Sequence, residues 1–212
     1  MTKLYTNAAA PGAENVEGER NTESAGNSQD TTRGTLTEAL TTADPLLHGW
    51  AAVVAAQCTA AGQLVVPLLP CSKHPLWRTG TGHLEGALCD AADVLAVAEG
   101  DYAGRDWSMP RAGRPGWGLV TGRGIVVLDL DTLDAIAWLD RLGAARPEVA
   151  AWVAATARVS TGRGLHLYGA TPDALPTSTS ALAPGVDVKG QGGFVCLPGC
   201  QHPLRSTIWR RR

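Results

Sequence analysis

Asp129 and Asp131 are two acids with one residue between them, and they follow the apolar run GIVVL at residues 124–128. Because side chains alternate across a strand, both carboxylates should project to the same face. Adjacent carboxylates repel each other unless a cation lies between them, and oxygen ligands select Mg²⁺ or Mn²⁺, which also bind phosphate oxygens. The pair therefore indicates metal-dependent nucleotide chemistry. An equally weighted alternative is that Asp131 only caps a helix beginning near Thr132.

A second candidate segment is STGRGLHLY, residues 160–168. Ser160 should end one strand, and His166 should lie in the next strand among polar neighbours. Arg163 and the backbone N–H groups of the flanking glycines could bind a phosphate in the turn between the strands. Taken alone, the pattern favours the simpler interpretation of a hairpin turn followed by a solvated histidine.

A third segment, GVDVKGQGG at residues 185–193, places an acid and a base on one strand face. Asp187 could supply a third carboxylate to the metal, and Lys189 could neutralise phosphate charge as a point cation. The alternative is an ordinary exposed ion pair, which contributes little stability. His202 follows in PGCQHP, either as a phosphate donor or as a loop histidine.

Hydrophobic spacing and turn residues predict the elements that must position these side chains. The expected elements are a helix over 45–62 ended by Gly62, a strand over 63–70, a loop over 71–86, a helix over 89–100 capped by Asp90, strands over 117–122 and 124–131, a helix over 132–155 interrupted near Gly143 and Pro147, and strand pairs within 157–170 and 185–199.

Composition suits one globular domain with a tail. The chain has 212 residues, 44% of them hydrophobic, and a formal net charge of -2, so no global basic field indicates nucleic acid. Residues 1–47 carry three Lys/Arg against seven Asp/Glu, and the remainder carries 15 against 13. We interpret residues 1–43 as a disordered acidic tail and residues 44–212 as the folded domain.

Cysteine usage indicates a reducing compartment. The five cysteines are an odd number, and no apolar leader follows Lys3, so a cytoplasmic location is expected. The apolar stretches are too short to span a bilayer, so no membrane role is expected. A zinc site is less favoured than scattered thiols and loop histidines, because its spacing would not be standard; its ligands would be Cys71, His74, His83 and Cys89.

The order of these motifs resembles the N-terminal primase-polymerase (prim-pol) domain of the archaeo-eukaryotic primase superfamily, from about Trp50 to Trp209. GQLVVPLLPCSKHPL resembles the opening strand and lysine-proline loop of the family, with Lys73 at the lysine, and GWGLVTGRG resembles the strand before the acids. The resemblance implies an α+β fold. A central antiparallel sheet, an RRM-like unit, would carry the motifs on one face with helices behind it, beside a smaller N-terminal α/β unit around residues 45–115.

The resemblance also implies roles for individual residues. Asp129, Asp131 and Asp187 would be the catalytic acids that bind Mg²⁺ or Mn²⁺. Contacts to the incoming nucleotide would come from Ser160, Arg163, His166, Lys189 and His202. Two departures stand out, because Lys189 occupies a position that is usually arginine and the residue before His202 is glutamine where the family usually has a serine before the histidine.

The implied activity is two-metal phosphoryl transfer that makes or extends primers on a single-stranded DNA template. The substrates would be ribo- or deoxyribonucleoside triphosphates, with a helicase or other replication protein possible in trans, and the chain would be a standalone enzyme or part of something longer. One alternative is a noncatalytic nucleic-acid or nucleotide-binding module on the same fold. A weaker one is a sugar-nucleotide transferase that uses the Asp129/Asp131 pair.

Overall fold

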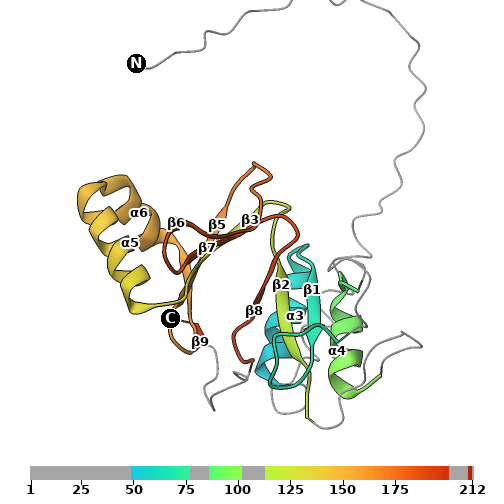
Figure 1. Ribbon diagram of the computed structural model, residues 1–212. Coiled ribbons are helices and arrows are strands. Elements are labelled where there is room, and N and C mark those ends of the chain that lie inside the picture. The colour runs from blue at the N-terminus through green and yellow to red at the C-terminus, as the bar shows by residue number, and fades with distance from the viewer. Residues whose placement is uncertain (1–48, 77–85, 102–112, 201–209, 212) are drawn as a thin grey trace, which may run out of the picture.

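Strands from distant parts of the chain combine into two antiparallel sheets, and the described part of the chain also contains four helices (Figure 1). The computed structural model describes residues 49–76, 86–101, 113–200 and 210–211. The elements are α3 (Trp50–Ala60), β1 (Val65–Leu68), α4 (Ala91–Glu99), β2 (Gly116–Val120), β3 (Ile125–Leu130), α5 (Leu133–Ala145), α6 (Pro147–Ala155), β4 (Ala157–Ser160), β5 (Leu165–Ala170), β6 (Ser178–Ala183), β7 (Val186–Lys189), β8 (Phe194–Cys196) and β9 (Arg210–Arg211). The predicted α+β class with a central antiparallel sheet is confirmed.

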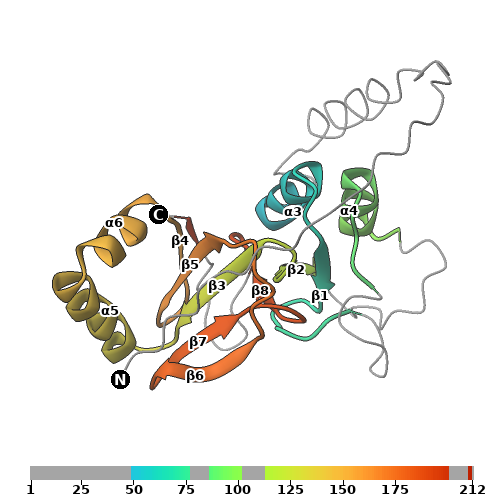
Figure 2. The same cartoon turned by 90° about the horizontal axis from the view of Figure 1, so that it is seen from above.

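The larger sheet has the strand order β6-β7-β3-β5-β4-β9, so β3 lies between β7 and β5. Strand alternation gives it two different faces. The back face packs against α5 and α6, which lie together on one side of the sheet (Figure 2). The buried residues of this contact are Leu130, Leu167 and Val186 on the sheet and Ala135 and Leu139 on α5. The opposite side, here called the front face, carries Val127, Asp129, His166, Asp187 and Lys189.

The smaller sheet has the order β1-β2-β8 and packs against α3 and α4 (Figure 2). Its core includes the fully buried Trp117, and alanines on α3 allow that helix to approach closely. The smaller unit therefore extends past residue 115, where the sequence placed its end. Strands β2 and β8 complete it, and β8 comes from far along the chain.

The pair of strands expected within residues 185–199 is not a hairpin, and this prediction is wrong. Strand β7 pairs with β3 and β6, whereas β8 pairs with β2 in the other sheet. The turn between them is fastened to both sheets, because Thr121 Oγ1 donates to the carbonyl of Gly190 at 2.7 Å and the N–H of Gly190 donates to Thr177 Oγ1 at 3.0 Å. These bonds direct the chain from one sheet to the other.

Local signals at helix ends agree better with the structure. Asp90 caps α4 by accepting from the N–H of Ala92 at 2.7 Å, as predicted. The long helix over 132–155 is broken as expected, with Arg146 between α5 and a Pro147 that begins α6. Its N-cap is Thr132, which accepts from the N–H of Ala135 at 3.1 Å. Asp131 is therefore not the cap of this helix.

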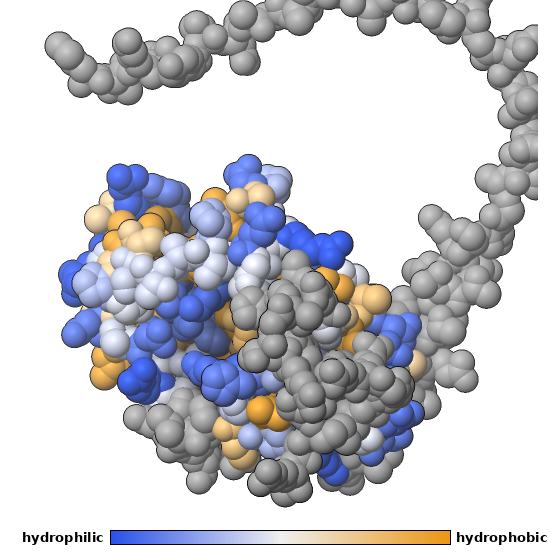
Figure 3. Space-filling view, turned by 45° about the vertical axis from the view of Figure 1, so that its right-hand side comes forward, coloured by the Kyte–Doolittle hydropathy of each residue, from blue (hydrophilic) through white to orange (hydrophobic). Residues whose placement is uncertain are grey.

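Surface hydrophobicity is dispersed on the face shown in Figure 3, where hydrophobic residues form small patches among hydrophilic ones. Isolated exposed apolar side chains of this kind are normal in soluble domains. None of the helices in the described ranges combines the length and the hydropathy that a bilayer crossing requires.

Candidate metal and nucleotide site

The candidate site begins with a row of three polar residues across the centre of the larger sheet. Asp129 on β3 lies directly opposite His166 on β5 and directly opposite Asp187 on β7. Directly opposed residues of antiparallel strands share a face, so all three side chains project to the front. Each of them is buried, at 4–7% exposure. Buried charges of this kind require partners.

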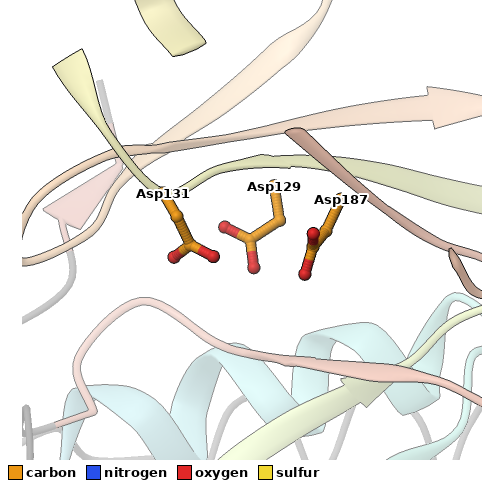
Figure 4. Close-up of side chains that lie close together, drawn as sticks. All are labelled: Asp129, Asp131 and Asp187. Carbon is orange, nitrogen blue, oxygen red and sulfur yellow. The ribbon is translucent and has the colours of Figure 1, made fainter. Parts of the chain in front are cut away.

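Asp131 lies just past the end of β3, two residues after Asp129. Its N–H donates to the carbonyl of Gly185 at 2.9 Å. One carboxylate oxygen from each of Asp129, Asp131 and Asp187 lies within 4.8 Å of the others. Figure 4 shows Asp129 between the other two, with all three carboxylates pointing to the same side. An all-oxygen set of three carboxylates fits a hard divalent cation such as Mg²⁺ or Mn²⁺.

One lysine and one histidine contact the buried acids from neighbouring strands. Lys189 Nζ lies 2.8 Å from Asp187 Oδ2 and 3.9 Å from Asp129 Oδ2. His166 Nε2 lies 3.3 Å from Asp129 Oδ1. The second oxygen of Asp187 accepts from the backbone N–H of Ser180 at 2.8 Å. The acids are thus held in fixed orientations on the front face.

The protein shifts the pKa values of Asp129 and Asp131 in opposite directions. Burial raises the pKa of Asp129, but the hydrogen bond and charge of His166, with the charges of Lys189 and Lys73, outweigh it and leave the pKa below its ordinary value. The pKa of Asp131 is raised by burial and by the negative charge of Asp129. Asp131 therefore carries an unfavourable charge at neutral pH, which a bound cation would relieve.

Asp131→Asn should slightly stabilise the metal-free protein at pH 7.5. A raised pKa in the folded state means that ionised Asp131 disfavours folding above that pKa, and the neutral amide removes this cost. The gain should shrink as the pH falls through the raised pKa and vanish below the ordinary carboxyl pKa, where both the folded and the unfolded state are protonated. Thermal denaturation in EDTA across this pH range measures it. A lower midpoint for the variant at pH 7.5 would contradict the expectation.

Two recesses border the acids. The larger, of about 130 Å³, is lined on one side by Asp129, His166 and Lys189 and on the other by Lys73 and residues 194–196 of the smaller sheet. The smaller, of about 30 Å³, is lined by Asp131, Arg163 and the turn at 161–162, again with Lys73. Lys73 reaches both recesses. The sequence pointed to it through the lysine-proline loop, whereas nothing in the sequence indicated the wall formed by β8.

The other predicted site residues are placed differently. Ser160 pairs with Leu165 and lines neither recess, while the adjacent Thr161 does, with its Oγ1 accepting from the N–H of Gly164 at 2.9 Å. Arg163 and His166 lie beside the acids. The Nδ1 atom of His166 is buried without a hydrogen-bond partner in the described part of the chain. His202 and the acidic tail over 1–43 lie outside the described residues.

The zinc hypothesis gains nothing from the structure. His83 lies outside the described residues, and Cys71 and Cys89 are exposed thiols. Across the described ranges, the three aspartates are the one group of His, Cys, Asp or Glu side chains close enough to hold a metal ion. Cys58, Cys196 and Cys200 form no disulfide, and burial raises the pKa of Cys196 to about 11, so its thiol is neutral beside the larger recess.

Comparison with known families agrees with this geometry. Residues 55–212 match the family model described as bifunctional DNA primase/polymerase, N-terminal. The match includes all three acids, the turn at 161–164 and the β7 to β8 segment. No curated protein matches the chain.

Proposed function

Because the chain belongs to the family of bifunctional DNA primase/polymerase N-terminal domains, we propose that it is a template-dependent nucleotidyltransferase that synthesises or extends primers on single-stranded DNA. The family generally consists of metal-dependent enzymes acting on nucleic acid and nucleotides. The observation that carries the proposal is the convergence of Asp129, Asp131 and Asp187 on one face. Lys189 and His166 contact these acids, and a lysine and a histidine at this place are suited to bind an anionic substrate.

Asp129, Asp131 and Asp187 would hold Mg²⁺ or Mn²⁺ through their converging oxygens. When bound, divalent ions supply an activated 3′-hydroxyl and stabilisation of the pyrophosphate leaving group. The part played by the chain is to position and neutralise. The sheet register fixes Asp129 and Asp187 relative to each other, so little reorganisation is needed as the substrates bind.

The triphosphate would bind in the larger recess and extend toward the smaller one. Lys73 and Lys189 line the larger recess as point cations, and His166 lies between the two recesses. Arg163 lines the smaller recess, where its guanidinium suits bidentate binding of phosphate. Contacts from Ser160 and His202 to the nucleotide stay expectations of the family resemblance, as does a helicase or other replication protein in trans.

The test is incorporation of labelled nucleotides by the full chain on single-stranded DNA of defined sequence, with Mg²⁺ and with Mn²⁺. Product should require the template and should follow its sequence, so that a homopolymer template directs incorporation of its complement alone. Separate reactions with ribo- and deoxyribonucleoside triphosphates would identify the preferred sugar. Folded protein that binds DNA and makes no product with either ion would instead favour the noncatalytic binding module.

A further inference from the structure

The Lys189 ammonium lies among the acids, beside the place where a metal ion would bind. It lies 2.8 Å from one oxygen of Asp187 and 3.9 Å from one oxygen of Asp129, on the face where the carboxylates converge. An ammonium at this distance opposes a metal ion at the same oxygen, because the two cations would repel each other at close range. Lys189 therefore neutralises Asp187 in addition to being available for a phosphate.

We propose that Lys189 is the resident counter-ion of the metal-free acids and that its side chain leaves Asp187 when metal and nucleotide bind. The arriving triphosphate gives the ammonium a new partner, and its departure frees Asp187 for the metal. Metal and nucleotide therefore favour each other's binding through one side chain. This inference rests on the proposed function, since it assigns the ligands to the same site.

The structure allows the side chain to move while its backbone stays fixed. Lys189 pairs with Val127 within the sheet, and the next residue, Gly190, is held by the hydroxyls of Thr121 and Thr177. The lysine side chain is part-exposed, at 21%, and borders the recess of about 130 Å³. A flexible four-carbon stem can carry the ammonium from the acid into this recess by rotation alone.

The exchange predicts that loss of the lysine charge changes the affinities for metal and for nucleotide in opposite directions. The lysine stabilises the metal-free acids and opposes the metal, but it stabilises the bound triphosphate. Removing the charge should therefore tighten metal binding and weaken nucleotide binding. A purely structural lysine, needed only to hold Asp187 in place, would weaken both when removed. Coupling of this kind is reciprocal, so the effect of nucleotide on metal affinity should fall by the same factor as the converse effect.

The test compares the wild-type chain with Lys189→Met in two titrations. Free Mn²⁺ is followed by electron paramagnetic resonance without nucleotide. Binding of a deoxynucleoside triphosphate with a non-cleavable α,β-imido bridge is measured in saturating Mg²⁺. For Lys189→Met we expect the Kd for Mn²⁺ to fall about tenfold and the Kd for the nucleotide to rise about tenfold, as for loss of one hydrogen bond between charged groups.

Arg158→Met is the matched control. Arg158 lies on β4 opposite Leu167, so it faces the back of the same sheet, and it lines a groove of α5 and α6. This substitution changes the net charge equally and should alter either Kd by less than about twofold, because the half-buried Arg158 lies on the face of the sheet that points away from the acids. Lys189→Arg keeps the charge and should leave the affinity for Mn²⁺ near that of the wild type.

Unchanged or weaker Mn²⁺ binding by Lys189→Met overturns the exchange, as does an equal gain in Arg158→Met. This result is separable from failure of the proposed function. If the wild type makes templated product but Lys189→Met binds Mn²⁺ no more tightly, the exchange alone is wrong. If Lys189→Met binds Mn²⁺ more tightly and the wild type makes no product, the polymerase assignment is wrong and the exchange stands.

Discussion

Asp129→Asn should lower kcat for templated nucleotide incorporation by about a thousandfold, which corresponds to several kcal/mol of lost transition-state stabilisation. Asp129 is the central member of the three acids and also contacts His166. Asparagine keeps the shape of the side chain but removes the negative charge, so the variant tests the charge alone. Single-turnover incorporation on a primed single-stranded template measures the effect.

Asp134→Asn is the control for this substitution. Asp134 lies in the first turn of α5 and is exposed, so its charge faces solvent. Its removal should change kcat by less than about twofold. If Asp129→Asn kept more than a tenth of wild-type activity, the three acids would not be the catalytic metal ligands.

The same substitution has a second consequence, opposite in sign to that of Asp131→Asn. Because the pKa of Asp129 is lowered in the folded protein, its ionised form stabilises folding above its unfolded pKa, and this stability is lost as the pH falls through the lowered value. Asp129→Asn should therefore lower the free energy of unfolding at pH 7.5 in EDTA. The two variants together would distinguish Asp129, whose charge stabilises the fold, from Asp131, whose charge destabilises it.

Gly164→Ala should destabilise the protein by at least about 3 kcal/mol, at the upper end of what overpacking usually costs. A Cβ at this position would overlap the carbonyl oxygen of Leu130 and come within 3.2 Å of the Cα of Asp131. Backbone atoms cannot rotate away as a side chain can, so the turn at 161–164 and the end of β3 would have to separate. Urea denaturation measures the free energy of unfolding.

Gly143→Ala is the matched control for that glycine. Gly143 lies inside α5, and a Cβ there would meet its nearest neighbour, in Ala150, at an ordinary 3.6 Å. Alanine in a helix interior is favoured over glycine by about 0.5–1 kcal/mol, so this variant should be more stable than the wild type. Equal stability of Gly164→Ala and the wild type would mean that the 161–164 turn packs less closely against β3 than the structure has it.

Much of the fold followed from local signals in the sequence. Alternation of apolar and polar residues placed Asp129 and Asp131 together, and cap residues located the start of α4. One of the missed elements is β6, whose residues STSALA are mostly exposed and carry no apolar alternation. A strand of this kind exists because β7 supplies its hydrogen bonds, which is information outside its own sequence.

The assignment of β8 to the smaller sheet was equally hidden. A glycine-rich turn between two short apolar runs resembles a hairpin locally. The pairing of β8 with β2 depends on close packing between them, because a Cβ on Gly118 would lie only 2.8 Å from the ring of Phe194. That complementarity joins residues far apart in the sequence, so spacing along the chain could not predict it.

For the site, strand alternation indicates which side chains share a face only once the neighbouring strands and their register are known. His166 faces the acids, but Ser160 pairs with Leu165, and it is Thr161 that reaches the recess. A one-residue offset exchanges the two faces of a strand. The rows joining Asp129 to His166 and Asp187 depend on which strands are neighbours, and only the three-dimensional structure supplies that order.

The smaller sheet also bears on the order of events during synthesis. Its strands begin at residues 65, 116 and 194, so β2 has a neighbour on one side only until the last of them has left the ribosome. Chains fold from the N-terminus as they emerge from the ribosome. The smaller sheet nevertheless stays incomplete until β3 and β7, the two strands that carry the acids or precede them, have already been made. Residues 194–196, which line the larger recess, are thus added after the acids that they face, so a nascent chain acquires its three carboxylates before it acquires one wall of that recess.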